Sequence, residues 1–133
     1  MQERFLLCLS LIVCSLSIMS FSVKSAELIM LEQEGCAWCE RWHEEVGDVY
    51  HKTAEGKIAP LVLVDIHEPK PYQYSLLKYS SFTPAFVVWH EGEEIGRIRG
   101  YPGEDFFWPL LAEILHKLPE DVRQGYHYNF DEK

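Results

Sequence analysis

Apolar residues fall along the chain in short, nearly continuous runs and in longer stretches with a helical repeat. Four runs rich in apolar and β-branched residues are expected to form strands, over residues 27–31, 60–66, 81–89 and 94–99. In residues 39–50 and 107–118, apolar side chains recur at every third or fourth position, which predicts amphipathic helices. A short helix is also expected over residues 72–79. Strands that alternate with helices predict an α/β domain.

Local signals refine this outline of helices and strands. Gly47 weakens the middle of the first helix and predicts a bend there, and Gly56 is expected to end that segment. Pro109 is expected either to start the last helix or to kink it. The run at residues 60–66 has almost no polar interruption, which predicts a strand covered on both faces.

The outline assigns one compact domain to residues 26–118. The chain has 133 residues, 47% of them hydrophobic, which is enough for one globular core and too few for two. Past Pro119 the residues are polar with scattered aromatics, so residues 119–133 are expected to form a polar, loosely held C-terminal tail.

The first 25 residues predict export from the cytoplasm. Met1–Arg4 is polar with one cation, and the chain then runs apolar from Phe5 to Phe21, which is the shape of a signal peptide. The alternative is an uncleaved N-terminal anchor. As a helix, however, this segment would span about 25 Å, less than the ~30 Å of a hydrocarbon core. We therefore expect a signal peptide over residues 1–25 and a periplasmic location for the remainder.

Charge narrows the range of partners. The formal net charge is −9, and the surface should therefore repel the phosphate backbone of nucleic acids. We expect no nucleic-acid partner and a monomeric protein.

The candidate chemistry lies directly after the first predicted strand, in Gly35-Cys36-Ala37-Trp38-Cys39. Cysteines three positions apart lie in the first turn of a helix, where unpaired N–H groups and the helix dipole favour the thiolate, the attacking species. Cys8 and Cys14 would leave with the signal peptide, so Cys36 and Cys39 remain as a pair in an oxidising compartment. The pattern predicts thiol–disulfide exchange, with Cys36 as nucleophile and Cys39 as resolving cysteine.

Three other roles of the cysteine pair fit the sequence less well. The pair would contribute little as a purely structural disulfide. Closing a four-residue loop stabilises the folded state by about 2 kcal/mol, against ~3 kcal/mol for a fifteen-residue loop. Cys36, Cys39 and His43 project from one side of the helix and could hold zinc or copper in a metal carrier, but no fourth ligand is evident. Covalent haem is excluded because Glu40, not histidine, follows Cys39. We expect no metal and no cofactor.

The order of elements and three further positions resemble the thioredoxin family. Thr83-Pro84 stands where that family has its cis-proline, and Gly92 and Gly100 follow at the family's spacing. The resemblance covers residues 26–118. It implies a thioredoxin-like three-layer α/β fold, in which a central mixed four-stranded sheet is flanked by helices and carries a cis-Pro loop.

Within that family the chain most resembles the periplasmic thioredoxin-like proteins encoded with bacterial sulfur-oxidation systems. The likeness is carried by residues 34–42, 52–56, 82–84 and 96–108. It implies a thiol–disulfide oxidoreductase that reduces a disulfide or blocked cysteine on a periplasmic partner, such as the sulfur-carrier protein of the pathway, with electrons from a membrane thiol donor. The alternative within the same chemistry is a disulfide-donating oxidase or isomerase.

The resemblance also implies a substrate-binding rim. A cis Pro84 would place the backbone of Thr83 beside Cys36 and offer it to an extended substrate strand, whereas a trans proline would only start an edge strand. Gly100 would let the substrate approach. Four aromatic residues could form an apolar rim around the sulfur: Trp38, Trp42, Phe82 and Tyr101. Of these, Trp38 is expected to be exposed and to face the substrate, whereas Trp42 is expected to lie in the core.

One position departs from the family pattern. General thioredoxins have a buried aspartate six positions before the first cysteine as a proton relay, and here that position is Met30. Proton transfer from Cys39 must then use another group, with water and Glu32 as candidates. Glu34 and Glu40 would raise the pKa of the thiols, whereas Arg41 and the helix dipole would lower it. The sign of the net shift in the thiol pKa therefore stays open.

Overall fold

The computed structural model describes residues 25–129. The predicted signal peptide or anchor therefore lies, apart from Ser25, outside the described residues. No helix within residues 25–129 combines the length and apolar character needed to cross a bilayer.

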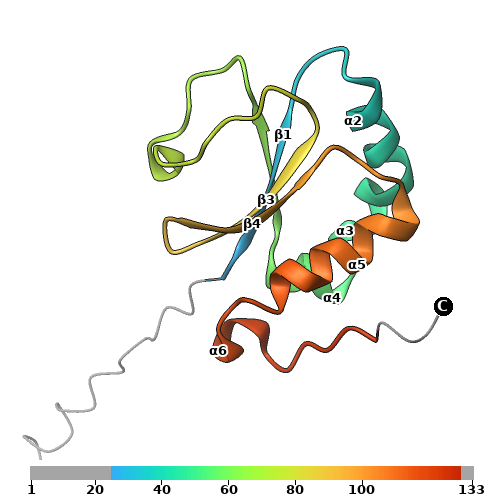
Figure 1. Ribbon diagram of the computed structural model, residues 1–133, viewed down its shortest axis with the longest axis vertical. Coiled ribbons are helices and arrows are strands. Elements are labelled where there is room, and N and C mark those ends of the chain that lie inside the picture. Colours follow the sequence, from blue (N-terminus) through green and yellow to red (C-terminus); the bar gives the residue numbers. More distant parts are fainter. Residues whose placement is uncertain (1–24, 130–133) are drawn as a thin grey trace, which may run out of the picture.

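A mixed four-stranded sheet forms the centre of the fold, in the order β2-β1-β3-β4. The strands are β1 (Glu27–Glu32), β2 (Leu61–Asp65), β3 (Ala85–His90) and β4 (Glu93–Arg99). β1 pairs parallel with β2 and antiparallel with β3, and β3 pairs antiparallel with β4 across a bulge at Val88/Trp89. The prediction of a mixed four-stranded sheet is confirmed (Figure 1).

The two faces of the sheet are covered unequally. Leu28 and Met30 of β1 face one core, which the helices complete, and the alternate residues Ile29 and Leu31 face the other. Figure 1 shows α2, α3, α4 and α5 on one side of the sheet and the chain from β2 to β3 on the other. That second layer holds only a 3₁₀ turn, η3 (Tyr72–Tyr74), where the sequence predicts a helix over residues 72–79.

The position of β2 in the sheet also differs from its prediction. The apolar run indicates a strand covered on both faces, but β2 lies at an edge of the sheet and the side chain of Leu63 is 49% exposed. Apolar composition therefore predicts that a strand forms, but not whether it lies at the centre or at the edge of the sheet.

The first predicted helix is broken into short pieces. They are α2 (Ala37–Trp42), a π-helical turn (His43–Gly47), α3 (Asp48–Tyr50) and α4 (Ala54–Ile58). Thr53 caps α4 by accepting a hydrogen bond from the Gly56 N–H at 3.0 Å. Gly56 is thus buried inside α4 and does not end the segment as predicted. A Cβ at this position would lie 2.0 Å from the Tyr50 carbonyl oxygen, so the glycine permits a close approach of two backbones.

The last long helix, α5 (Glu104–Leu115), packs Phe107, Leu111 and Leu115 into the larger core. Pro109 lies inside α5, on the side away from that core, and the helix continues through it. The side chain of Ile114 rests against Gly96 of β4, which holds α5 close to the sheet.

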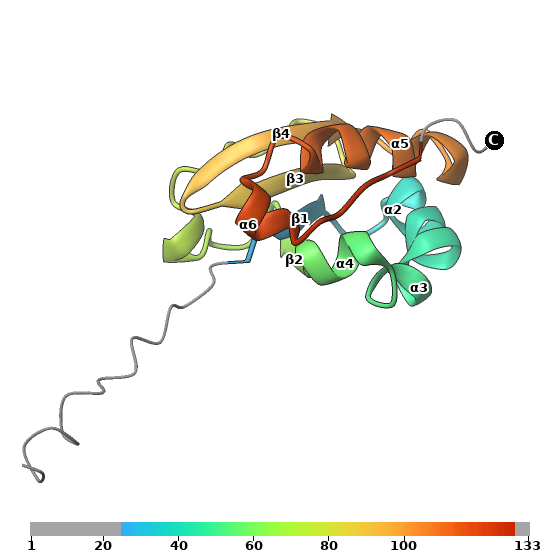
Figure 2. The same ribbon diagram turned by 90° about the horizontal axis from the view of Figure 1, so that it is seen from below.

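The expectation of a loosely held tail is wrong for the residues that directly follow α5. Residues 120–123 form α6 (Glu120–Arg123), and Val122 and Tyr126 are buried. The Tyr126 hydroxyl donates a hydrogen bond to Glu55 of α4 at 2.7 Å. Figure 2 shows the chain after α6 running back past α4. Aromatic residues within a polar segment were the sequence signal for this packing.

Candidate active site

The two cysteines form a disulfide where β1 passes into α2. The S–S distance is 2.05 Å and the Cα–Cα distance is 5.2 Å. Gly35 takes a left-handed conformation (φ +72°) in the turn after β1, which a side chain would resist. Cys36 is the N-cap of α2, and its Sγ accepts a hydrogen bond from the Cys39 N–H at 3.2 Å. The sulfur of Cys36 thus lies against the N–H groups of the first helical turn.

The two cysteines differ in exposure. Cys36 retains 9% of its surface and Cys39 retains 4%. Trp38 lies beside them with 54% of its surface exposed, whereas Trp42 is fully buried against Phe86 and Phe107. Cys36 is therefore the more accessible of the two sulfurs, and it lies in the same helical turn as an exposed indole.

The loop that precedes β3 contains the Thr83–Pro84 peptide bond, which is cis, the isomer that the family resemblance implies. The Gly100 N–H donates a hydrogen bond to the Pro84 carbonyl at 2.8 Å, so this loop is tied to the end of β4. Gly100 has φ +80°, and a Cβ there would meet nothing within 4 Å. The space beside Gly100 is therefore open.

Gln33 connects the loops at this end of the sheet, a role that the sequence did not indicate. Its Nε2 donates to Thr83 Oγ1 at 3.0 Å, and its Oε1 lies 2.8 Å from His67 Nε2. Since the amide oxygen is an acceptor, His67 donates through Nε2. One side chain thus links the ends of β1 and β2 to the cis-proline loop.

A second polar chain ties α2 to the loop after β4. The Tyr101 hydroxyl donates to Glu45 at 2.6 Å, and Arg41 Nε donates to the other oxygen of Glu45 at 2.7 Å. Both hydrogen bonds lower the pKa of Glu45 below its ordinary value, and the bond from Tyr101 has the larger effect. Arg41 also lies 5.6 Å from the centre of the Trp38 ring. Tyr101 is only 6% exposed, so the prediction that it forms part of an open apolar rim is wrong.

Acidic groups near the disulfide are arranged differently from the family pattern. Met30 is fully buried in the same apolar cluster as Cys36 and Cys39. Glu32, a candidate for proton transfer, lies at the end of β1 with its carboxylate 2.8 Å from His43 Nε2. Within residues 25–129, no three His, Cys, Asp or Glu side chains are grouped so that they could hold a metal ion. The ligand set of the metal-carrier alternative, Cys36 with Cys39 and His43, is therefore not assembled.

Comparison with known proteins places this geometry in a family. No family model matches the chain, and no curated protein matches it by sequence. Among solved structures, the chain is similar to the periplasmic thioredoxin SoxS from Paracoccus pantotrophus in its reduced form, with 42% identity and a TM-score of 0.67. The match covers 70% of this chain and 98% of that one. The strand order, the dithiol at the start of α2 and this similarity together show that the chain belongs to the thioredoxin family, close to SoxS, and is a thiol–disulfide oxidoreductase.

Proposed function

We propose that the Cys36–Cys39 pair reduces a disulfide, or an otherwise blocked cysteine, on a partner protein in the periplasm. The observation that carries this proposal is the position of Cys36 at the start of α2, with its Sγ against a backbone N–H and with more exposed surface than Cys39. A sulfur in this position is favoured as a thiolate, and the thiolate is the nucleophile in disulfide exchange.

The reaction begins with the reduced dithiol. The Cys36 thiolate attacks one sulfur of the partner disulfide, so a Cys36–partner bond forms while the partner's S–S bond breaks and its second sulfur leaves as a thiolate. Cys39 then attacks Cys36 Sγ, which releases the partner's first sulfur and closes the Cys36–Cys39 disulfide. Two electrons pass to the partner, which ends with two thiols, and the protons lost by the dithiol balance them.

The resting disulfide must be reduced again before the next cycle. A membrane thiol donor supplies the two electrons by the same exchange in reverse, and its own dithiol becomes a disulfide. With Met30 in place of a buried acid, the proton of Cys39 leaves through water or through Glu32.

The rim around Cys36 binds the partner as an extended strand. Within residues 25–129 the backbone N–H and C=O of Thr83 form no backbone hydrogen bond, and in this proposal they pair with the substrate strand. The open space beside Gly100 admits the backbone of that strand, and the exposed face of Trp38 contacts its side chains. The domain acts as a monomer once the segment over residues 1–25 is removed by export.

The reducing direction is supported by two likenesses. The chain resembles thioredoxin-like proteins encoded with sulfur-oxidation systems, whose implied partner is a sulfur-carrier protein with a cysteine that must be kept free. The similar solved structure is likewise a periplasmic thioredoxin. The reduction potential separates this direction from the oxidase alternative. A value near that of thioredoxin, about −270 mV, fits a reductant, and a value near about −120 mV fits an oxidant.

The decisive experiment is trapping in intact cells with Cys39→Ser. Without the resolving sulfur, the mixed disulfide on Cys36 accumulates, and mass spectrometry of the captured adduct identifies the partner. Cys36→Ser is the matched control, because it retains one cysteine in the same helix but should capture nothing. Equal capture by both variants, or capture by neither, would contradict the assigned roles.

A further inference from the structure

A groove of about 850 Å³ lies outside the sulfur site, between residues 76–82 and strand β4. Gly96 of β4 faces α5, so its neighbour Arg97 projects from the opposite face of the sheet, where Trp89 of β3 also lies. Among residues 25–129, only a 3₁₀ turn and loops cover this face. The thin second layer therefore leaves part of β3 and β4 uncovered.

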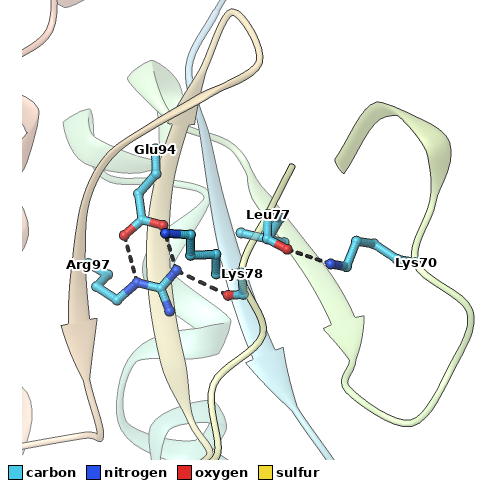
Figure 3. Close-up of polar contacts among 5 residues, drawn as sticks. All are labelled: Lys70, Leu77, Lys78, Glu94 and Arg97. Atoms are coloured by element: carbon cyan, nitrogen blue, oxygen red, sulfur yellow. Dashed lines mark hydrogen bonds and ion pairs between the residues drawn. The ribbon is translucent and has the colours of Figure 1, made fainter. Parts of the chain in front are cut away.

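The wall formed by residues 76–82 is fixed from both sides (Figure 3). Lys70 Nζ donates to the Leu77 carbonyl at 2.5 Å, and Arg97 donates to the Lys78 carbonyl at 3.1 Å. Arg97 is itself held by Glu94, with Nε to Oε1 at 2.6 Å. Because consecutive carbonyls of the wall are anchored, the groove is formed before anything binds.

One end of the groove lies next to the cis-proline loop. Phe82 is 76% exposed on its wall and immediately precedes Thr83 and Pro84. On the opposite wall, Arg99 pairs in register with Ala85, the residue after Pro84, and precedes Gly100. A polypeptide that passes the cis-proline loop can thus continue into the groove.

Apolar surface and positive charge are combined in this groove. Phe82 and Leu76, each 76% exposed, line the groove together with Trp89 and offer apolar contacts. The charged lining residues are Lys78, Glu93, Glu94, Arg97 and Arg99. The net formal charge of these five residues is positive, although the net formal charge of the whole chain is −9.

Arg99 is the available cation at the end of the groove near the sulfur site. Glu94 is taken by Arg97, and Glu93 lies at the far end, beside the turn that joins β3 to β4. The Arg99 guanidinium is exposed and forms no side-chain hydrogen bond or close ion pair within residues 25–129. Its charge nevertheless acts on Glu94, whose pKa is lowered first by the hydrogen bond from Arg97 and also by Arg99. The Arg99 guanidinium can therefore donate two hydrogen bonds to a carboxylate of a bound chain.

We propose that this groove binds the segment of the partner polypeptide that flanks its reactive cysteine, and that this segment is acidic. The inference rests on the proposed function and specifies its substrate class. An apolar side chain contacts Phe82 and a carboxylate pairs with Arg99, so the local field attracts a partner that the rest of this acidic surface repels.

Synthetic peptides test the preference directly. Each contains one cysteine, held as a mixed disulfide with 2-mercaptoethanol, and the flanking residues are Glu, Gln or Lys. The second-order rate constant for reduction by pre-reduced protein should be about fivefold higher for the Glu peptide than for the Gln peptide, and lowest for the Lys peptide. Arg99→Glu should abolish or invert this order. Lys57→Glu, which reverses an exposed charge on α4, should preserve it, and added salt should weaken it.

Two further measurements keep the groove and the chemistry separable. Arg99→Glu and Lys57→Glu should reduce the neutral bis(2-hydroxyethyl) disulfide at the wild-type rate, because this small molecule does not reach the groove. Peptides with serine in place of cysteine should still bind the oxidised protein in the order Glu, Gln, Lys, and Phe82→Ser should weaken all three, as NMR titration would show.

The outcomes decide between the two proposals. Equal rates for the three peptides, or a Glu preference that survives in Arg99→Glu, would overturn the groove proposal and leave the oxidoreductase proposal standing. Failure to reduce even the small disulfide would overturn the proposed function, and the serine peptides would then decide the groove by binding alone. A dimer that buries the groove and is lost in Phe82→Ser would also overturn it.

Discussion

The sulfur atoms of Cys36 and Cys39 lie one helical turn apart, and they should differ in reactivity once the disulfide is reduced. Cys36 caps α2 and is 9% exposed, whereas Cys39 is 4% exposed within the core cluster. Iodoacetamide should therefore modify Cys36 first, at least about tenfold faster than Cys39 at pH 7. Peptide mapping by mass spectrometry over a time course measures both rates.

The unfolded protein is the control for this prediction. In denaturant the helix start and the apolar cluster are lost, so the two cysteines should react at similar rates. If the folded protein also modified them at the same rate, the assignment of Cys36 as nucleophile would lose its physical basis.

Tyr74 gives a pH-dependent prediction at the same scale. It is buried, and its hydroxyl donates to Glu27 at 2.8 Å. Burial and then the Glu27 carboxylate raise its pKa to about 12. Because the pKa is raised in the folded state, the stabilising contribution is complete below the unfolded pKa of about 10 and is lost as the pH rises from there toward 12.

Tyr74→Phe should therefore lower the free energy of unfolding by about 1 kcal/mol at pH 8, and the difference from wild type should shrink by pH 11. Urea denaturation at the two pH values measures it. Tyr72→Phe is the matched control, since Tyr72 is 92% exposed and should cost little at either pH. A difference that grew with pH would reverse the sign of the argument.

Which residues of the site could be found from the sequence depends on how local their signal is. Cys36, Trp38 and Cys39 lie within one turn, and their spacing alone places them at a helix start. Gln33 bonds Thr83 across 50 positions, and Tyr101 bonds Glu45 across 56. Contacts of that range arise only once the sheet has formed, so composition and spacing gave no sign of them.

At the scale of helices and strands, α3 and α4 can pack closely only because Gly56 has no Cβ. A Cβ there would lie 2.0 Å from the Tyr50 carbonyl oxygen, and that oxygen is backbone and has little room to move. Gly56→Ala should lower the free energy of unfolding by about 3 kcal/mol, because the joint between α3 and α4 must open. Thermal and urea denaturation both measure this loss.

Gly47→Ala is the matched control on the neighbouring helical turn. There the Cβ would first meet a side-chain atom, Nδ1 of His43, at 3.3 Å, and alanine has the better helix propensity. The expected change is within about 1 kcal/mol of wild type. A Gly56→Ala protein as stable as Gly47→Ala would show that the two segments are not packed as described.

The elements themselves were predictable to different degrees. β1 and β3 lie in the middle of the sheet, and their apolar runs report burial on both faces. β2 has the same composition but an edge position, which depends on strand order and not on the strand's own sequence. Residues 72–79 lack the length of a helix with a full apolar face, and only Tyr74 and Leu77 bury there.

At the scale of the whole molecule, the segment after α5 covers part of the larger core. Val122 and Tyr126 join the same cluster as the helices and β1, although they lie in a segment that reads as polar. A few apolar side chains suffice because the body of the domain already supplies the complementary surface. The sequence showed Tyr126 as an aromatic residue in a polar segment, but not the buried acid, Glu55, to which its hydroxyl donates.

Tyr126→Phe tests whether this closure contributes to stability. Glu55 is 8% exposed, and the phenylalanine would remove the hydroxyl that donates to it while leaving the packing intact. A buried acceptor without its donor costs about 1–3 kcal/mol, so the urea midpoint should fall by the corresponding amount. His127→Ala, at an exposed neighbouring position, should leave the midpoint unchanged.

The double variant Tyr126→Phe/Glu55→Gln separates the hydrogen bond from a general loosening of the segment. If the cost comes from the orphaned Glu55 carboxylate, replacing that carboxylate by an amide should leave the double variant no less stable than Tyr126→Phe alone, because the two changes remove one shared interaction. Strict addition of the two single losses would instead place Tyr126 and Glu55 in independent roles, and the C-terminal segment would then be held by apolar contact alone.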